Sequence, residues 1–396
     1  MARTVRDVVI CSGVRTPVGK FGGGLASVPP TQLGAKVVRE AVKRAGVEPE
    51  TVGHVVFGNV IHTSTKDMYL SRVCSVEGGL PVEVPALTVN RLCGSGLQAI
   101  VSAAQYIELG QADITLAGGA ESMSRSPYWA DGARTGLRMG DGTLVDAMVG
   151  ALSDPFEDCH MGVTAENVAE QWGISREDQD KLAVESHQRA ARAWDEGRFD
   201  DQVLPIEVEG RKGTTTVNRD EHVRPDASLE GMSKLKPVFA KEGSVTAGNA
   251  AGLNDAAAAV VLMDAETAER QGQEPLGRLV AYAHAGVEPK YMGIGPVPAV
   301  RKVLELANLK VDDLDVIELN EAFAAQALAV ARDLGFDMEK TNPNGSGVSL
   351  GHPIGATGAI LTVKALYELH RTGGRYGLVT MCIGGGQGIA AIVERT

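Results

Sequence analysis

The sequence predicts an α/β fold in which two related halves, each built on a parallel sheet, are separated by an insertion. Three observations support this prediction. Short apolar strands alternate with helices in the first 122 residues. The same order of elements returns after about residue 275. Between the halves, the stretch 123–252 is rich in turns and charge and breaks the alternation, which indicates an inserted loop domain.

The first half begins with a buried strand and ends with a glycine pair. Its expected elements, in order, are the strand 8–14, the helix 32–45, the strand 54–57 leading to Asn59, the strand 84–89, a helix after Gly96 and the strand 113–117 closed by Gly118-Gly119. In the second of these helices, Leu97, Ile100 and Ala104 recur at helical spacing. The strand 256–263, within the stretch 253–274 that completes this half, holds only small and apolar residues.

The insertion contains one well-marked helix, over 176–195, with Ser175 as its N-cap. The second half, 275–396, follows the order of the first. Its expected elements are the strand 279–283, the helix 297–307, the strand 316–319 closed by Asn320, a glycine-containing helix that begins at His352, and a last strand that leads to Gly384-Gly385.

The two halves resemble a duplicated unit. Cys93 follows Asn59 at nearly the same interval as His352 follows Asn320, and each begins a helix that leads to a strand and a glycine pair. The alternative is a pair of ordinary βαβ units without common origin. If the duplication holds, Cys93 and His352 occupy equivalent helix starts and can face each other across a pseudo-twofold axis.

The composition is that of a folded globular protein, because 44% of its 396 residues are apolar. A formal charge of −12 and 4% of aromatic residues argue against a nucleic-acid partner. The apolar run 8–11 is too short for a signal peptide, and no stretch has the ~18 apolar residues of a membrane helix. We expect a cytoplasmic protein that does not bind membranes. The five cysteines form no Cys-x-x-Cys pair and are odd in number, so we expect reduced thiols rather than disulfides or a zinc site. The histidines also lack the spacing of metal ligands.

Cys93 stands between an apolar strand and a helix, which suggests a nucleophile. Unpaired N–H groups and the positive end of the dipole at a helix N-terminus favour a thiolate, and the glycines that follow allow another molecule to approach the backbone. The alternative is a buried thiol that acts as a small hydrophobe. His352, between Gly351 and Pro353, is the candidate base, with a core histidine as its alternative.

Cys382 and the three glycines 384–386 suggest a second reactive segment. Consecutive glycines present backbone N–H groups suited to an oxyanion hole, where one donor is typically worth ~2.7–4 kcal/mol in the transition state. Asn320 either caps its strand or holds a catalytic water. Because all these residues follow strand ends, we expect them to form one site.

Two further signals concern the ligand. Residues 94–99, Gly-Ser-Gly-Leu-Gln-Ala, fit the dinucleotide fingerprint and are the case for an NAD-linked oxidoreductase, although no acidic residue ends the next strand. The segment 210–241 carries a local excess of basic side chains, which suits the phosphates of coenzyme A. Its basic residues are Arg211, Lys212, Arg219, Arg224, Lys234, Lys236 and Lys241.

Along essentially its whole length, the chain resembles the thiolase family. The segments that carry the resemblance are Asn90-Arg91-Leu92-Cys93-Gly94-Ser95-Gly96, Asn320-Glu321-Ala322-Phe323-Ala324, Asn342-Pro343-Asn344-Gly345-Ser346-Gly347 with Gly351-His352-Pro353, and Cys382-Ile383-Gly384-Gly385-Gly386-Gln387-Gly388. The resemblance implies a duplicated five-layered αβαβα fold whose inserted loop domain covers coenzyme A. It also implies a homodimer or homotetramer, acyl-CoA substrates and no tightly bound cofactor.

The same resemblance implies roles for the site residues. Cys93 takes up the acyl group, His352 activates it and Cys382 moves the α-proton. Asn320 holds a water that shares one oxyanion hole with His352, while backbone N–H groups of Cys93 and Gly384 form a second hole. The reaction is the condensation of acetyl-CoA with acetyl-CoA or a short acyl-CoA, or the reverse thiolysis.

Other residues match the family's pocket walls. By resemblance, the substrate-binding positions are His160, Met161, Arg224, Phe239, Ala247, Ala251, Met292, Ala322 and Phe323. Many relatives carry serine where Ala251 stands, so one hydroxyl contact to pantetheine is missing here. Besides the oxidoreductase, the remaining alternative is a non-catalytic acyl-CoA or lipid carrier.

Overall fold

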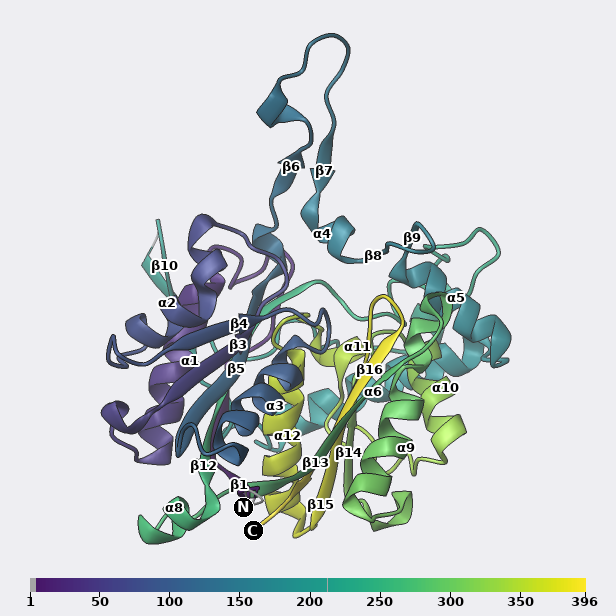
Figure 1. Ribbon diagram of the computed structural model, residues 1–396. Coiled ribbons are helices and arrows are strands. Elements are labelled where there is room, and N and C mark those ends of the chain that lie inside the picture. Colours follow the sequence, from purple (N-terminus) through teal and green to yellow (C-terminus); the bar gives the residue numbers. More distant parts are fainter. Residues whose placement is uncertain (1–4, 212) are drawn as a thin grey trace.

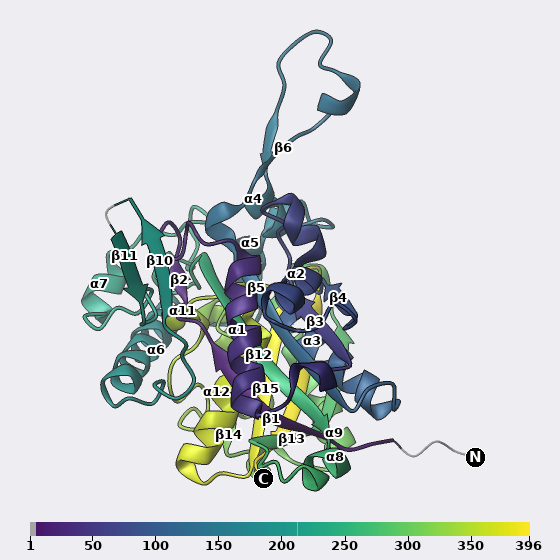
Figure 2. The same cartoon turned by 90° about the vertical axis from the view of Figure 1, so that its left-hand side faces the viewer.

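A ten-stranded sheet runs through both halves of the chain (Figures 1 and 2). The structure is a computed structural model that describes residues 5–211 and 213–396. The strands of the first half are β1 (Val8–Arg15), β2 (Gly19–Lys20), β3 (His54–Gly58), β4 (Ala86–Val89), β5 (Ile114–Ser122) and β12 (Asn254–Asp264). Those of the second half are β13 (Gly277–Gly286), β14 (Val316–Leu319), β15 (Tyr376–Ile383) and β16 (Gln387–Glu394).

The strand order demonstrates the duplication. The first half is ordered β1-β12-β5-β3 and the second β13-β16-β15-β14. In each half the first two neighbouring pairs are antiparallel and the third is parallel. The halves join where Val9 and Ile10 pair with Arg278 and Gly277. Two unrelated βαβ units would not share this whole pattern.

Helices form the other three layers. They are α1 (Pro30–Ala45), α2 (Leu70–Glu77), α3 (Ser95–Glu108), α8 (Ala265–Arg270), α9 (Pro296–Ala307), α10 (Ala324–Leu334), α11 (Gly347–Leu350) and α12 (Thr357–Thr372). Figure 1 shows α3 and α12 side by side between the two parts of the sheet, with α1 and α2 outside one part and α9 and α10 outside the other. Three separate apolar clusters fill the spaces between these five layers. The predicted five-layered αβαβα arrangement of two related halves is confirmed.

The position of β12 in the sheet explains the continuous apolar run 256–263 of its sequence. Its residues are buried on both faces. Ala258 and Val260 face the cluster around α3 and α12, while Ala259 and Val261 face the cluster beneath α1. Because successive side chains of a strand point to opposite faces, a strand between two helical layers must be apolar at every position.

The sheet is mixed, so the prediction of a purely parallel sheet was wrong. β15 and β16 form a hairpin, and β12 runs antiparallel to both β1 and β5. A turn as short as Gly384 to Gly386 can only join antiparallel strands. Gly118 and Gly119 also lie within β5 rather than at its end.

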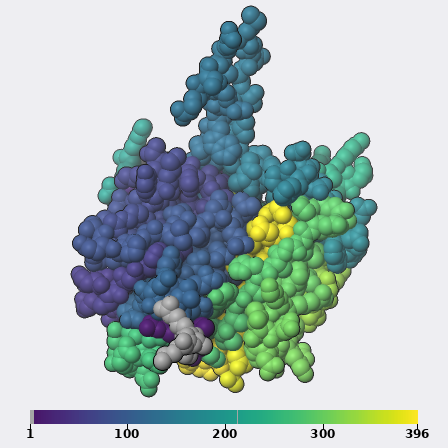
Figure 3. Space-filling model, viewed as in Figure 1, coloured from purple at the N-terminus to yellow at the C-terminus, as the bar shows by residue number. Residues whose placement is uncertain are grey.

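The insertion adds no strand to the main sheet among the described residues. Its elements are β6 (Tyr128–Ala130), β7 (Leu144–Asp146), α4 (Ala147–Ala151), β8 (Ser153–Asp154), β9 (Cys159–His160), α5 (Met161–Gln171), α6 (Arg176–Asp195), β10 (Ile206–Gly210), β11 (Gly213–Val217) and α7 (Leu229–Ser233). As predicted, α6 is capped by Ser175, whose hydroxyl accepts from Asp178 N at 3.1 Å. The hairpin β6–β7 projects far from the body (Figures 1 and 3). In the part of the chain that is described, no helix has the length and hydropathy to cross a membrane.

Candidate active site

One pocket of about 500 Å³ lies beyond the ends of β4, β14 and β15, with walls from both halves and the insertion. Among its lining residues are Cys93, His160, Met161, Arg224, Phe239, Ala247, Ala251, Met292, Ala322, Phe323, His352, Cys382 and Gly384. Of the predicted catalytic and substrate-binding residues, Asn320 alone is absent from this wall, and it lies buried beside His352. The structure therefore brings both thiols and the histidine to one cavity.

A strained turn presents Cys93 to this pocket. Leu92, just before it, has a positive φ of 44°, which is costly for a residue with a branched side chain. The turn is held by Ser95, whose Oγ accepts from Arg91 N at 2.8 Å and donates to Leu92 O at 2.7 Å. Asn90 Oδ1 accepts from Leu92 N at 2.9 Å. Local side-chain contacts thus fix the backbone that carries the sulfur.

The expectation that Cys93 rests as a thiolate was wrong. Burial raises the pKa of the Cys93 thiol to about 11, although N–H groups of Gly384 and of Cys93 itself oppose the shift. The helix α3 begins at Ser95 with Gly94 as its N-cap, so Cys93 lies directly before the helix, and burial outweighs the contribution of the helix N-terminus there. Cys93 therefore rests as a thiol and needs a base.

His352 is neutral and can serve as that base. Burial lowers its pKa to about 4, because desolvation disfavours the imidazolium. Its backbone N–H donates to Asn254 Oδ1 at 2.9 Å, and three residues later Gly355 N donates to a side-chain oxygen of the buried Glu121 at 2.9 Å. The helix α12 begins at Thr357, so His352 lies in the preceding loop rather than at the helix start.

We predict that iodoacetamide alkylates Cys93 before the other cysteines, because Cys93 is partly exposed in the pocket while Cys11, Cys74 and Cys382 are buried. The rate should rise about tenfold per pH unit between pH 7 and 9, since the thiolate fraction grows below a raised pKa. Acetyl-CoA added beforehand should protect it. Peptide mass spectrometry identifies the alkylated residue, and faster labelling of the half-buried Cys159 would contradict this account.

Asn320 directly follows β14 and contacts the ring of His352. Its Nδ2 lies 3.4 Å from each ring nitrogen of His352, and its Oδ1 has no partner although it is buried. A buried carbonyl oxygen without a partner is a natural site for a bound water. The geometry therefore favours the water-holding interpretation over a simple strand cap.

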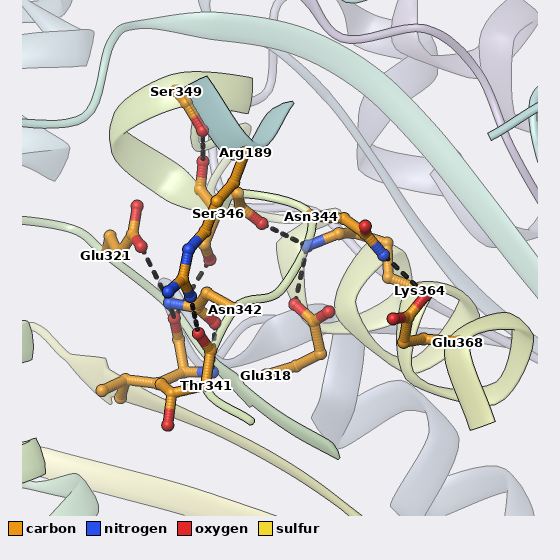
Figure 4. Close-up of polar contacts among 12 residues, drawn as sticks. Arg189, Glu318, Glu321, Thr341, Asn342, Asn344, Ser346, Ser349, Lys364 and Glu368 are labelled. Carbon is orange, nitrogen blue, oxygen red and sulfur yellow. Dashed lines mark hydrogen bonds and ion pairs between the residues drawn. The ribbon is translucent and has the colours of Figure 1, made fainter. Parts of the chain in front are cut away.

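A buried polar network holds Glu318 and Glu321, on either side of Asn320 in the sequence (Figure 4). Asn342, at a positive φ of 50°, donates to Leu319 O at 2.8 Å and to Glu321 Oε1 at 2.9 Å. Lys364 pairs with Glu318 at 2.6 Å, and neither side chain is exposed. Since these partners flank Asn320 on both sides, they hold the whole strand end in register with the His352 loop.

Cys382 is the second-to-last residue of β15, just before the glycine loop. Burial, together with the neighbouring Cys93 sulfur, raises the pKa of the Cys382 thiol. Gly385 and Gly386 have positive φ values of 79° and 81°, which the three-residue hairpin requires. A Cβ at Gly384 would lie 3.1 Å from the Met161 methyl, so a side chain there would crowd the pocket.

Apolar side chains line the pocket around Cys382. Met161, Met292, Phe239 and Phe323 belong to one cluster that also includes Cys382. His160 stacks on Phe239 with ring centroids 4.7 Å apart. The segment with Ala247 and Ala251 is tied to this wall, because Ala251 N donates to Ala322 O at 3.0 Å. These contacts explain why residues from distant segments share the pocket.

Sequence reasoning missed part of the pocket. The unpredicted lining residues are Met123, Met148, Val149, Leu152, His222, Val238, Thr246, Ala250, Gly252, Leu253 and Ile354. Several come from short, irregular elements of the insertion, where no periodicity signals burial. His222 lies against His187 with ring centroids 6.2 Å apart, and burial lowers its pKa to about 4, so it is neutral.

The basic segment contributes one cation to the pocket wall. Arg224 lines the pocket, whereas Lys234 pairs with Glu230 at 2.6 Å and Arg219 lies over the Trp194 ring. Lys212 lies outside the described residues. In the described part of the chain, no group of His, Cys, Asp and Glu side chains is arranged to hold a metal ion.

The glycines after Cys93 pack against the chain itself rather than against a nucleotide. A Cβ at Gly96 would lie 2.8 Å from Ala359 N, and one at Gly358 would lie 2.2 Å from Leu97 N. The fingerprint glycines therefore allow α3 and α12 to begin in contact. No space remains there for a pyrophosphate, which removes the main structural argument for a dinucleotide site.

Comparisons with known proteins agree with this geometry. The family model described as "Thiolase, N-terminal domain" matches residues 8–266, and "Thiolase, C-terminal domain" matches residues 273–395. The chain is 66% identical over 391 residues to beta-ketothiolase BktB of Cupriavidus necator, covering 98% of this chain and 99% of that protein. It is 50% identical to an acetyl-CoA acetyltransferase of Syntrophomonas wolfei, covering 98% of this chain and 99% of that protein.

Solved structures give the same result. The crystal structure of Bacillus anthracis acetyl-CoA acetyltransferase has a TM-score of 0.98 and 47% identity and covers 100% of both chains. Human mitochondrial 3-ketoacyl-CoA thiolase in complex with CoA has a TM-score of 0.96 and 45% identity, covering 99% of this chain and 98% of that one. Neither the oxidoreductase nor the non-catalytic carrier is supported by these relatives.

Proposed function

Because the chain belongs to the thiolase family and is an acyl-CoA C-acyltransferase, we propose that it works through an acyl group held on Cys93. It joins acetyl-CoA to acetyl-CoA or to a short acyl-CoA, or cleaves 3-ketoacyl-CoA in reverse. The observation that carries this proposal is the convergence of Cys93, His352 and Cys382 on one apolar pocket.

In the first half-reaction, Cys93 attacks the thioester carbonyl while His352 takes the thiol proton. A concerted transfer is needed, because the pKa of Cys93 is raised to about 11 and that of His352 is lowered to about 4. The oxyanion is stabilised by N–H groups of Cys93 and Gly384. Collapse breaks the carbon–sulfur bond to coenzyme A, whose sulfur receives the proton from His352. The acyl group then remains on Cys93.

In the second half-reaction, Cys382, a thiol at rest because its pKa is raised, passes its proton to His352 and then removes a proton from the α-carbon of acetyl-CoA. The water on Asn320 and the Nε2–H of the protonated His352 stabilise the enolate oxygen. The enolate carbon attacks the acyl carbonyl on Cys93, and the Cys93 sulfur leaves and takes the proton from His352, while Cys382 keeps the α-proton. Cys382 thus begins and ends this half-reaction in the same state. Two thiols are required, because acyl transfer and proton removal occur at different carbons.

The pocket walls support a preference for short acyl groups. Met161 and Met292 are unbranched and adaptable, whereas the rings of Phe239 and Phe323 meet edge to face with centroids 6.2 Å apart and limit the depth. We predict thiolysis of four- and five-carbon 3-ketoacyl-CoA and a steep fall for long chains. A rate series over chain lengths measures this, and equal rates with a sixteen-carbon substrate would contradict it.

Coenzyme A is a substrate and product in this proposal and not a bound cofactor. Arg224 supplies positive charge at the pocket, and we propose that it contacts the nucleotide end of coenzyme A. Ala251 lines the same pocket without a hydroxyl, so pantetheine must rely there on backbone groups. We also propose that residues 123–252 form an inserted loop domain between the two halves and that this domain covers the coenzyme.

We also propose a homodimer or homotetramer. The projecting hairpin β6–β7 and its tip expose apolar side chains, including Trp129 at 55%, Leu137 at 62% and Met139 at 99%. Such side chains on a projecting arm suit contact with another copy of the chain. A cytoplasmic location suits two catalytic thiols that must stay reduced. There, thiolysis would serve fatty acid β-oxidation, and condensation would supply 3-ketoacyl-CoA as a precursor of polyhydroxyalkanoate.

A further inference from the structure

The ring of His352 has one close polar partner. Its Nδ1 lies 2.7 Å from Thr357 Oγ1, whereas Asn320 Nδ2 is 3.4 Å from both ring nitrogens. At 3.4 Å a hydrogen bond is weak, while 2.7 Å is a full-strength contact. Thr357 is 2% exposed, so little water competes for its hydroxyl. The hydroxyl of Thr357 therefore decides the state of Nδ1.

The direction of this hydrogen bond follows from the second partner of Thr357. A threonine hydroxyl has a single hydrogen to donate, and Thr357 Oγ1 also lies 3.0 Å from Pro353 O. A backbone carbonyl can only accept. Threonine in a helix commonly donates to the carbonyl four residues earlier, and Thr357 N donates to the same oxygen at 3.0 Å. With its hydrogen used on Pro353 O, the hydroxyl must accept from His352 Nδ1–H.

From this arrangement we propose that Thr357 is a positioning residue that holds His352 in the tautomer protonated on Nδ1. The lone pair of Nε2 is then free to take the proton of Cys93. The inference rests on the proposed role of His352 as base. The same hydrogen bond survives when His352 is protonated, since Nδ1–H remains a donor. Thr357 thus supports the base before and after the proton transfer.

The test compares Thr357→Val with Thr357→Ser. Valine has nearly the shape of threonine but offers no acceptor, which leaves a buried Nδ1–H unpaired or shifts the proton to Nε2. We expect the burst of coenzyme A released from acetyl-CoA to slow about tenfold to a hundredfold, the usual effect of an unpaired buried donor. KM for acetyl-CoA should stay near the parent value. Serine keeps the hydroxyl and should restore most of the rate.

Thr362→Val is the matched control. Thr362 lies in the same helix, is 1% exposed and donates to Gly358 O at 2.8 Å through the same local bond, without touching His352. It should keep the parent burst rate, so that loss of a buried hydroxyl alone cannot explain a slow Thr357→Val. Nitrogen-15 NMR of histidine-labelled protein, with His352→Gln to assign the signal, should show Nδ1 protonated in the parent enzyme.

The outcomes separate this inference from the proposed function. If His352→Gln keeps the burst, the base itself is misassigned and the proposed mechanism fails. If His352→Gln loses the burst but Thr357→Val keeps the parent rate, the role of Thr357 alone is overturned. An NMR signal with Nε2 protonated in the parent enzyme would also overturn it, because the lone pair would then face Thr357.

Discussion

Cys382→Ala should leave an enzyme that accepts one acetyl group and then stalls. Acylation uses Cys93 and His352, so acetyl-CoA should still release a burst of free coenzyme A equal to the number of active sites. Condensation requires removal of an α-proton, and no other cysteine lies in the pocket wall with Cys93. General acid–base groups contribute about 10²–10⁴-fold, so turnover should fall by at least that factor while the burst survives.

Stopped-flow detection of free thiol measures the burst, and a steady-state assay measures turnover. Cys74→Ala is a suitable control, since Cys74 is also a fully buried thiol but packs beneath α1, away from the pocket. It should keep both phases if it folds. A Cys382→Ala protein that condenses at the parent rate, or a folded one that loses the burst as well, would show that Cys382 does not carry the α-proton.

His352→Gln should lose the burst itself. Without a base, acylation depends on the small fraction of Cys93 that ionises without assistance. With the pKa of Cys93 at about 11, only about one thiol in 10⁴ is ionised at pH 7. The burst should therefore slow by about 10²–10⁴-fold. Thermal unfolding checks that the buried substitution leaves the protein folded.

The pH dependence of this variant provides the sharper test. Its burst rate should rise about tenfold per pH unit from pH 7 to 10, as Cys93 ionises. The parent rate should change little over that range, because His352 with its pKa near 4 is already neutral. A burst in His352→Gln that does not rise with pH would mean that deprotonation of Cys93 is not the step His352 assists.

Much of the framework was predictable from local patterns. The helix α6 with its Ser175 cap and the strand β14 match their predicted positions, because capping and apolar periodicity act within a few residues. The meeting of Cys93, His352 and Cys382 was also predictable. Strand ends in an α/β sheet converge, although His352 lies in the loop before α12 and not at the helix start that the duplicated order predicted.

Other features depend on contacts that local patterns do not encode. The antiparallel course of β12 follows from its return after the insertion, and the raised pKa of Cys93 follows from burial by several segments. Gly96 matched a nucleotide fingerprint, yet its lack of a side chain serves the contact with α12. Met148 and His222 reach the pocket from irregular stretches, where no spacing predicts a wall.

The acyl-Cys93 intermediate is the centre of this account, and one measurement tests it most directly. Cys382→Ala protein, mixed with acetyl-CoA and quenched in acid within seconds, is digested and its acetylated peptide sequenced by mass spectrometry. The account predicts one acetyl group per chain, on the sulfur of Cys93, and none in a matched sample of Cys93→Ala. Acetyl found on another residue, or a burst of coenzyme A that persists in Cys93→Ala, would contradict it.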